Sequence, residues 1–242
     1  MVIEWITDKF IPWFFDSPSP IIAFVSVSLA FVVYLYQRAE KKKHLACSIA
    51  NKYAVYFLPR IRYIGKVLQL ANVTPIISRF EEADNYDEKE LKRILNGQQS
   101  SIEDLKNKIA SVNKEELEMA LCYSGNPSYM IPIHTHLAEN IDKDFYLVFS
   151  KFVLDMLNEL EGEITALRYN IADEKLVYQS LHQTYLNHMK NWYFFIAYEN
   201  TTDESQYYSN IIFLYRLWKK RNTQEKEKIQ KFIKNRGIGK SL

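Results

Sequence analysis

Residues 21–36 read IIAFVSVSLAFVVYLY, and residues 37–44, which follow them, read QRAEKKKH. No charged residue lies between Asp16 and Arg38. As a helix, sixteen residues would be about 24 Å long, a little shorter than the hydrocarbon core of a bilayer at about 30 Å. Local thinning of the bilayer accommodates such a mismatch. The stretch therefore predicts a transmembrane helix over residues 21–37.

The charges on either side favour this interpretation over the alternative, a helix buried in a soluble core. Acidic residues dominate before the stretch, whereas basic residues dominate in the segment 38–43 that follows it. Because basic loops stay on the cytoplasmic side of a membrane, we expect an outside N-terminus and a cytoplasmic domain after Arg38. The basic cluster follows the apolar run instead of preceding it, so we expect no cleaved signal peptide.

Aromatic and basic residues mark the two ends of the predicted span. Residues 1–20 form a short amphipathic segment, which we expect to lie on the outer leaflet. Tyrosines at the other end suit the cytoplasmic interface, where aromatic rings reach the head groups. The predicted membrane-anchoring residues are Trp5, Trp13, Tyr34, Tyr36, Arg38, Lys41, Lys42 and Lys43.

Residues 38–72 predict a stalk helix that continues the span into the cytoplasm. Apolar residues recur in it at every fourth position, and we expect a monomer to leave this stripe partly exposed: Leu45, Ile49, Tyr53 and Phe57. Pro59 should kink the helix, because proline removes a backbone hydrogen bond.

Residues 73–136 predict short peripheral helices followed by a loop. Helix starts are indicated at Asp87, Ser100 and Asn113, since each precedes an acidic residue by three positions. The stretch is acidic and its apolar stripes are thin, so we expect it to pack on the outside of the domain.

Residues 137–242 predict a bundle of long helices. The period of apolar residues indicates helices over residues 142–169 and 173–198, the second with Asp173 as its N-cap. A third should begin near Thr202 or Asp203, with a restart at Thr223 as one reading. No alternation of period two is present, so the predicted fold class is all-α: a transmembrane helix, a stalk and a cytoplasmic helical bundle.

The charge distribution is uneven along the chain. Residues 216–240 carry ten basic and two acidic residues, although the whole chain has a net charge of only +2. This basic end could bind anionic lipid, nucleic acid or an acidic neighbouring subunit, or it could be a solvated helix. Cys47 and Cys122 lack metal-site spacing and fit free thiols in a reducing cytoplasm.

Residues with catalytic or metal-binding chemistry are present, but none forms a recognisable site. His134 and His136 lack a third ligand at a familiar spacing. His182 and His188 are six residues apart on a helix and point in different directions, so we read them as packing or partner histidines. The terminal GIGKS lacks the first glycine of a phosphate-binding loop and the helix that must follow it. We therefore expect no catalytic, cofactor or metal site.

Two further features carry hypotheses about individual residues. Arg38 and His44 have the spacing of the arginine–histidine pair in the small helical ribonuclease domains called HEPN, where such a pair holds a phosphate and moves a proton. Glu161 lies in an apolar helix, so if it is partly buried it must be paired. Its candidate partners are Arg168, Lys175 and His182, which favours a structural polar lock over a general base.

Three segments together resemble an uncharacterised group of small bacterial proteins with one N-terminal span and a helical domain of unknown function. They read LNELE, RYNIADEKLVYQSLHQTYL and YYSNIIFLYRLW at residues 157–161, 168–186 and 207–218. The layout is also similar to the membrane accessory protein of type VI-B CRISPR systems. The resemblance implies a place in the bacterial inner membrane, an accessory or effector role in antiphage defence, and a pore-like ring.

From these features we expect a non-enzymatic, single-span protein that forms a homo-oligomer in the lipid bilayer. A cytoplasmic protein partner and nucleic acid are further candidates. The alternatives are a membrane-tethered domain that binds or cleaves RNA, and a housekeeping membrane adaptor. Small residues at spacings of three and four would let neighbouring spans approach closely: Ala23, Ser26 and Ala30.

Overall fold

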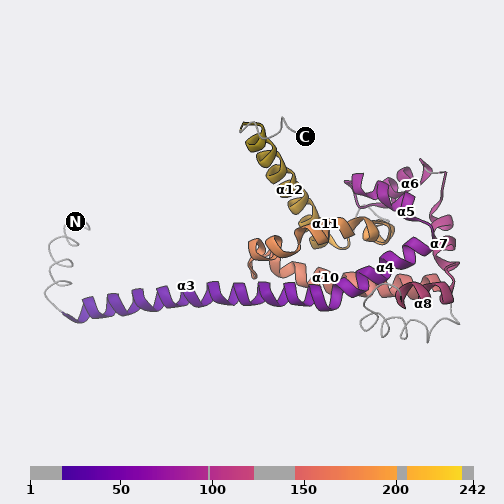
Figure 1. The fold of residues 1–242 in the computed structure, drawn as a ribbon. Coiled ribbons are helices and arrows are strands. Elements are labelled where there is room, and N and C mark those ends of the chain that lie inside the picture. The colour runs from indigo at the N-terminus through magenta and orange to yellow at the C-terminus, as the bar shows by residue number, and fades with distance from the viewer. Residues whose placement is uncertain (1–17, 98, 123–144, 201–205, 236–242) are drawn as a thin grey trace. The chain divides into compact units, whose positions relative to one another are not determined.

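The computed structural model describes residues 18–97, 99–122, 145–200 and 206–235, and every element within these ranges is helical (Figure 1). This confirms the all-α fold class for the described ranges. The chain divides into two compact units, Met1–Leu45 and Ala46–Leu242. The first helix, α3 (Pro18–Lys52), begins in the first unit and ends in the second.

The second unit contains the other elements. Most are α-helices, with one π-helix and one 3₁₀-helix. In chain order they are η2 (π, Tyr53–Phe57), α4 (Leu58–Leu70), α5 (Thr74–Ile77), η3 (3₁₀, Ser78–Glu82), α6 (Glu88–Asn96), α7 (Ile102–Ala110), α8 (Lys114–Cys122), α10 (Phe145–Arg168), α11 (Glu174–Glu199) and α12 (Ser209–Asn235).

The helix α11 forms the centre of this unit. It contacts α4, α6, α10, α12 and η3, and its residues 192–197 are buried without interruption (Figure 1). A helix that is apolar on all sides must be covered on all sides. Sequence periodicity found the stripe that contains Tyr185, Met189 and Tyr193, all of which are buried. The other faces of the helix are buried by the short helices and by α10.

The predicted kink at Pro59 is preceded by a π-helix. The backbone N–H of Leu58 donates to the carbonyl of Tyr53, five residues earlier, in place of the usual four. Proline lacks an N–H, and its ring crowds the carbonyl four residues before it. A wider turn directly before the proline accommodates both effects, and the helix then continues as α4.

One side of residues 46–57 lies in the core of the bundle, which differs from the predicted stalk. Ala46, Ile49, Tyr53 and Phe57 are each no more than 5% exposed. The second compact unit begins at Ala46, whereas the sequence placed the boundary of the bundle at residue 137. The stripe is covered by α10, α11 and α12 of the same chain, because residues such as Leu160, Tyr185 and Trp218 line the same apolar space. It is therefore not available to a neighbouring protomer.

The short helices also bury more than their sequence indicated. Leu91, Leu95, Leu105, Ile109 and Leu117 are all at most 1% exposed. A nine-residue helix that turns two or three apolar residues inward contributes fully to the core when a long helix lies beneath it.

The helix caps agree with the sequence in three cases and shift in a fourth. The side chains of Asp87, Asn113 and Asp173 accept hydrogen bonds from backbone amides in the first turns of α6, α8 and α11, as predicted. The predicted start at Ser100 is wrong by one residue, since Ser101 and Asp104 form the reciprocal capping box of α7. This register turns Leu105 and Ile109 toward the core.

The long helices match their predicted positions to within a few residues. α10 and α11 differ from the expected bounds by at most three residues at each end. α12 begins at Ser209 and runs without a restart at Thr223. The predicted start at Thr202 or Asp203 lies outside the described residues, as do Trp5, Trp13, His134 and His136.

Candidate functional site

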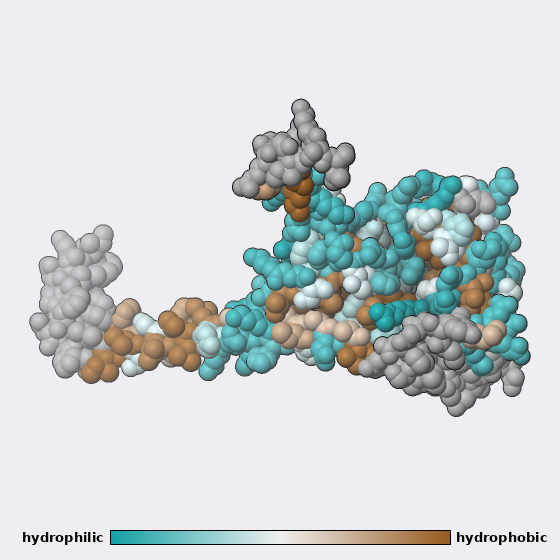
Figure 2. Space-filling model, in the orientation of Figure 1, coloured by the Kyte–Doolittle hydropathy of each residue, from teal (hydrophilic) through white to brown (hydrophobic). Residues whose placement is uncertain are grey.

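The exposed part of α3 is the most distinctive surface of the described chain. Its most apolar window contains no buried residue, and Phe24, Val27 and Phe31 expose 63%, 69% and 59% of their surface. Figure 2 shows hydrophobic residues on the visible face of this part of the helix. By length and composition α3 can cross a membrane. Core helices of soluble proteins meet the same two criteria, but their apolar residues are buried.

The aromatic and basic residues predicted as anchors lie at the end of this surface. Tyr34 and Tyr36 are 56% and 67% exposed. Arg38, Lys41 and Lys43 are exposed and Lys42 is half-buried, and Lys43 pairs with Glu40 at 2.9 Å. Positions 38 to 43 cover about 500° of rotation around a helix, so these positive charges surround α3 on several sides. A ring of this kind suits a head-group layer.

The arginine and histidine with nuclease-like spacing are not brought together. Arg38 and His44 both lie exposed on α3. Six residues along a helix place two side chains about 120° apart. The two positions therefore lie on different sides of α3, and the nuclease-like pair stays a prediction.

Glu161 on α10 is half-buried, and its carboxylate lies at the beginning of α12. Its Oε1 accepts from the backbone N–H of Asn210 at 2.9 Å, and its Oε2 accepts from that of Ile211 at 2.9 Å. These amides have no partner inside their own helix, and the positive end of the helix dipole favours a negative charge there. Glu161 is thus a helix cap supplied by a different helix.

The predicted partners of Glu161 have other contacts, which corrects the sequence-based assignment. Arg168 donates to the side-chain oxygen of Asn210 at 2.7 Å, so it supports the same helix start without touching Glu161. His182 contacts the carbonyl of Tyr178 through Nδ1 at 2.6 Å. Lys175 lies exposed on α11. A glutamate within an apolar helix signals a paired carboxylate, but no sequence pattern reveals that backbone amides are the partners.

A second buried carboxylate was missed by the sequence. Glu90 on α6 is 8% exposed and accepts from the hydroxyl of Tyr193 at 2.8 Å and from the backbone N–H of Asp84 at 3.2 Å. Burial, together with the neighbouring Glu90, raises the pKa of Tyr193, which therefore stays protonated and donates. The buried side chain of Asn200 joins two further segments: it donates to the carbonyl of Tyr86 at 2.8 Å and accepts from the N–H of Tyr207 at 2.7 Å.

A third polar cluster joins α11 to α12. The hydroxyl of Tyr178 donates to Glu225 at 2.8 Å, and the guanidinium of Arg221 lies 3.8 Å from the centre of the Tyr178 ring. Burial and the Glu225 carboxylate raise the pKa of Tyr178 to about 12. The ring of His182 stacks on that of Tyr178, with ring centres 4.2 Å apart. These contacts fix α12 where it leaves the bundle.

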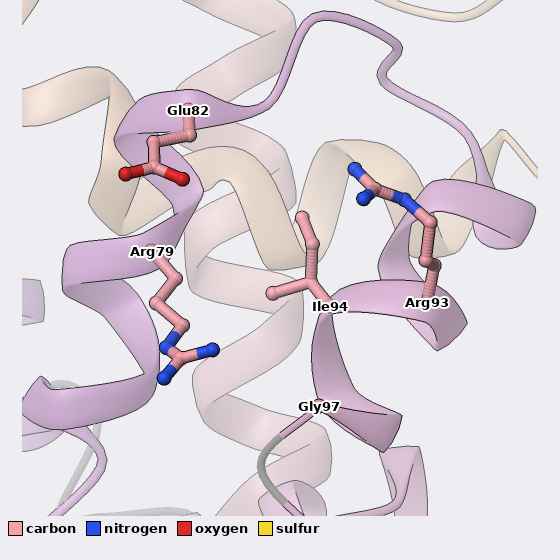
Figure 3. A pocket seen from close by; sticks show the side chains of 5 residues that line it. All are labelled: Arg79, Glu82, Arg93, Ile94 and Gly97. Atoms are coloured by element: carbon pink, nitrogen blue, oxygen red, sulfur yellow. The ribbon is translucent and has the colours of Figure 1, made fainter.

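A surface hollow between η3 and α6 has a volume of about 210 Å³. Arg79 and Glu82 line it from η3, Arg93 and Ile94 line it from α6, and Gly97 lines it directly after α6 (Figure 3). Arg93 is also 3.7 Å from Glu90. Two guanidinium groups and a carboxylate give the rim both signs of charge, so it selects no particular class of ligand.

Several titratable residues of the domain have structural partners. Within the described ranges, no group of three His, Cys, Asp or Glu side chains is positioned to hold a metal ion. Glu161, Glu90 and Tyr193 each bind structural partners. The half-buried His188 contacts the carbonyl of Thr184, and burial lowers its pKa.

Comparison with known proteins found no match to a family model, to a curated protein or to a solved structure. The resemblance drawn from the sequence therefore stays a prediction.

Proposed function

We propose that this protein is a single-span integral membrane protein, anchored by α3, whose second compact unit is a cytoplasmic helical domain. The observation that carries the proposal is the exposure of residues 22–36, which are apolar around the helix and unburied. Burial of apolar surface is worth about 25 cal/mol per Å². Soluble monomers rarely leave more than a few hundred Å² of contiguous apolar surface in water.

The length of the uncharged part of α3 supports a full span. The helix begins at Pro18, and its residues from Pro18 up to Arg38 carry no charge. Twenty helical residues rise about 30 Å, which matches the hydrocarbon core more closely than the sixteen residues of the apolar core alone. The basic cluster at residues 38–43, directly after the uncharged part of α3, favours an N-terminus outside the bacterial inner membrane.

The domain acts, in this proposal, through binding and not through catalysis. What supports this is that the carboxylates of Glu161 and Glu90 are engaged by backbone amides and a tyrosine hydroxyl, so they are not free to move a proton. An accessory or effector role in antiphage defence rests on the resemblance alone. Homo-oligomerisation is supported by the exposed small residues Ala23, Ser26 and Ala30 on the span. The buried stripe from Ile49 to Phe57 no longer supports it.

Accessibility of cysteines to a membrane-impermeant maleimide tests the anchor and its orientation. Native Cys47 is exposed and lies after the basic cluster, so it reports the cytoplasmic side. A second variant, Ser17→Cys with Cys47→Ser, reports the other side, and both carry Cys122→Ser. We expect Ser17→Cys to react in intact cells and Cys47 to react only after lysis. Equal reaction of both in intact cells, or release of the protein by alkaline carbonate, would contradict the anchor.

Light scattering of the detergent-solubilised chain, with the detergent mass subtracted, tests the oligomer. We expect a mass that is a multiple of 28.7 kDa. A mass of 28.7 kDa at every concentration would rule out the homo-oligomer and leave the anchor intact.

A further inference from the structure

The last turns of α12 form a helix that extends beyond the bundle. Each residue from 226 to 233 is exposed, including three large apolar ones: Ile229 at 58%, Phe232 at 52% and Ile233 at 41%. In Figure 1 this end of α12 leads away from α10 and α11. Figure 2 shows hydrophobic residues near it. We call residues 226–233 the α12 arm.

The apolar residues of the α12 arm lie on one side of it. At 3.6 residues per turn, Ile229, Phe232 and Ile233 fall within about 100° of the helix circumference. Lys226 and Lys228 flank this face, one on either side, at about 70° and 90° from its centre. Glu227 lies almost opposite, at about 170°. The arm is therefore amphipathic, with a narrow apolar face bordered by positive charge.

The lysines of the arm are available to a ligand. Among the described residues, Lys226, Lys228 and Lys231 form no ion pair, although other lysines of the chain pair with carboxylates, as Lys52 does with Glu163 at 2.8 Å. Three other cations at the base of α12 contact the rest of the bundle: Arg221 pairs with Glu174, Arg216 donates to the carbonyl of Asp84, and Lys219 donates to the carbonyl of Glu81. Positive charge thus accumulates on the part of α12 that the bundle leaves exposed.

We propose that the α12 arm is a second membrane-binding element, which lies on the surface of a bilayer that contains anionic lipid. Its apolar face enters the boundary between head groups and acyl chains, and the flanking Lys226 and Lys228 reach the lipid phosphates along their aliphatic stems. The proposal rests on the proposed function, because the span would tether the domain that carries the arm to the bilayer. Anchoring raises the local concentration of lipid around the arm, so that even a weak lipid-binding surface is occupied.

The charge pattern favours lipid over a protein partner as the occupant. Lysine is depleted in the cores of protein–protein interfaces, where flanking cations must be desolvated. At an anionic membrane the same lysines gain attraction from the surface potential. A second copy of the arm would bring two sets of lysines together, which is unfavourable by simple repulsion.

An environment-sensitive dye on the full-length chain tests the arm directly. The dye is attached to Ile229→Cys or, as a control on the opposite face, to Glu227→Cys, each in the background Cys47→Ser with Cys122→Ser. The protein is reconstituted into vesicles of phosphatidylcholine alone or with about a third phosphatidylglycerol. We expect a blue shift at position 229 only in the anionic vesicles, and no shift at position 227.

Charge variants separate the arm from general effects of charge. Replacing Lys226, Lys228 and Lys231 by glutamine should abolish the blue shift. The charge-matched control, Lys108→Gln with Lys151→Gln and Lys175→Gln, should keep it, since these exposed lysines lie on other helices. A blue shift that is equal in both kinds of vesicle, or that depends on protein concentration in detergent, would overturn the proposal in favour of a protein contact.

Flotation of the same vesicles distinguishes failure of the arm from failure of the anchor. Protein that floats with neutral vesicles but shows no lipid-dependent shift at position 229 overturns the arm and leaves the span intact. Protein that floats only with anionic vesicles, and only when the three lysines are present, supports the arm and overturns the span. Protein that floats with neither overturns both.

Discussion

Residues 22–36 and residues 46–57 belong to one continuous helical run, and both are rich in apolar side chains, but their surroundings are opposite. In the first stretch the apolar residues cover every side of the helix and are exposed. In the second, polar residues such as Ser48, Asn51 and Lys52 separate a stripe of buried residues: Ala46, Ile49, Tyr53 and Phe57. The distribution of apolar residues around the helix, more than their number, distinguishes the exposed stretch from the stretch that packs into the core.

The largest effect should come from placing charge in each stretch. Val27→Arg with Phe31→Arg disfavours insertion by about 3 kcal/mol for each arginine, so we expect loss of the protein from the carbonate-resistant membrane fraction. Ile61→Arg, in the buried continuation of the run, should keep the protein in the membrane but make its domain sensitive to protease. If instead the Ile61 variant left the membrane, or the Val27 and Phe31 variant stayed in it with a protease-sensitive domain, the two stretches would have been assigned to the wrong surroundings.

Replacing single side chains of the π-helix by alanine compares a buried residue, Phe57, with an exposed one, Val55. Phe57 is 1% exposed and Val55 is 60% exposed. Phe57→Ala should lower the unfolding free energy of the domain by about 3–5 kcal/mol. Val55→Ala should change it by less than about 0.5 kcal/mol. Urea unfolding of the full chain in detergent, followed by circular dichroism, measures both. Equal effects would place this turn outside the core.

Polar contacts also hold the helices that cover the buried stripe. Glu161 on α10 caps the start of α12, which is one of these helices. Glu161→Ala leaves the amides of Asn210 and Ile211 without their acceptor, and we expect a loss of about 1–3 kcal/mol. Glu159, on the same helix and more exposed, serves as the control, since its contact with Lys52 is 3.8 Å long. Surface pairs of that kind contribute about 0–1 kcal/mol. Similar melting curves for Glu161→Ala and Glu159→Ala would argue against the cap.

The smallest effect should be a dependence on pH that affects the domain and not the anchor. Burial lowers the pKa of His188 below its ordinary value of 6.5, and the nearby positive charges of Arg62 and Lys190 lower it further. Below pH 6.5 the unfolded state then binds more protons than the folded state, so stability falls as the pH falls. His188→Gln should flatten the stability profile between about pH 8 and pH 5, whereas His44→Gln on exposed α3 should not. Membrane retention should be the same at both pH values.

The sequence by itself determined the elements whose signals are local. The uncharged run before Arg38, the period of the long helices and the capping side chains of Asp87 and Asp173 are all readable within a few neighbouring residues. These signals arise from the geometry of one helix and from its nearest hydrogen bonds. They gave the all-α class, the long helices to within a few residues and the candidate span.

Only the tertiary structure decided which apolar stripe is covered and which carboxylate meets which amide. The stripe from Ile49 to Phe57 has the same period whether a neighbour or its own bundle covers it, and here α10, α11 and α12 do so. Glu161 could be recognised as a paired residue, but its partners lie 49 and 50 positions along the chain on a helix end. Such contacts depend on how helices pack in space, and the period of one helix carries no information about its partner.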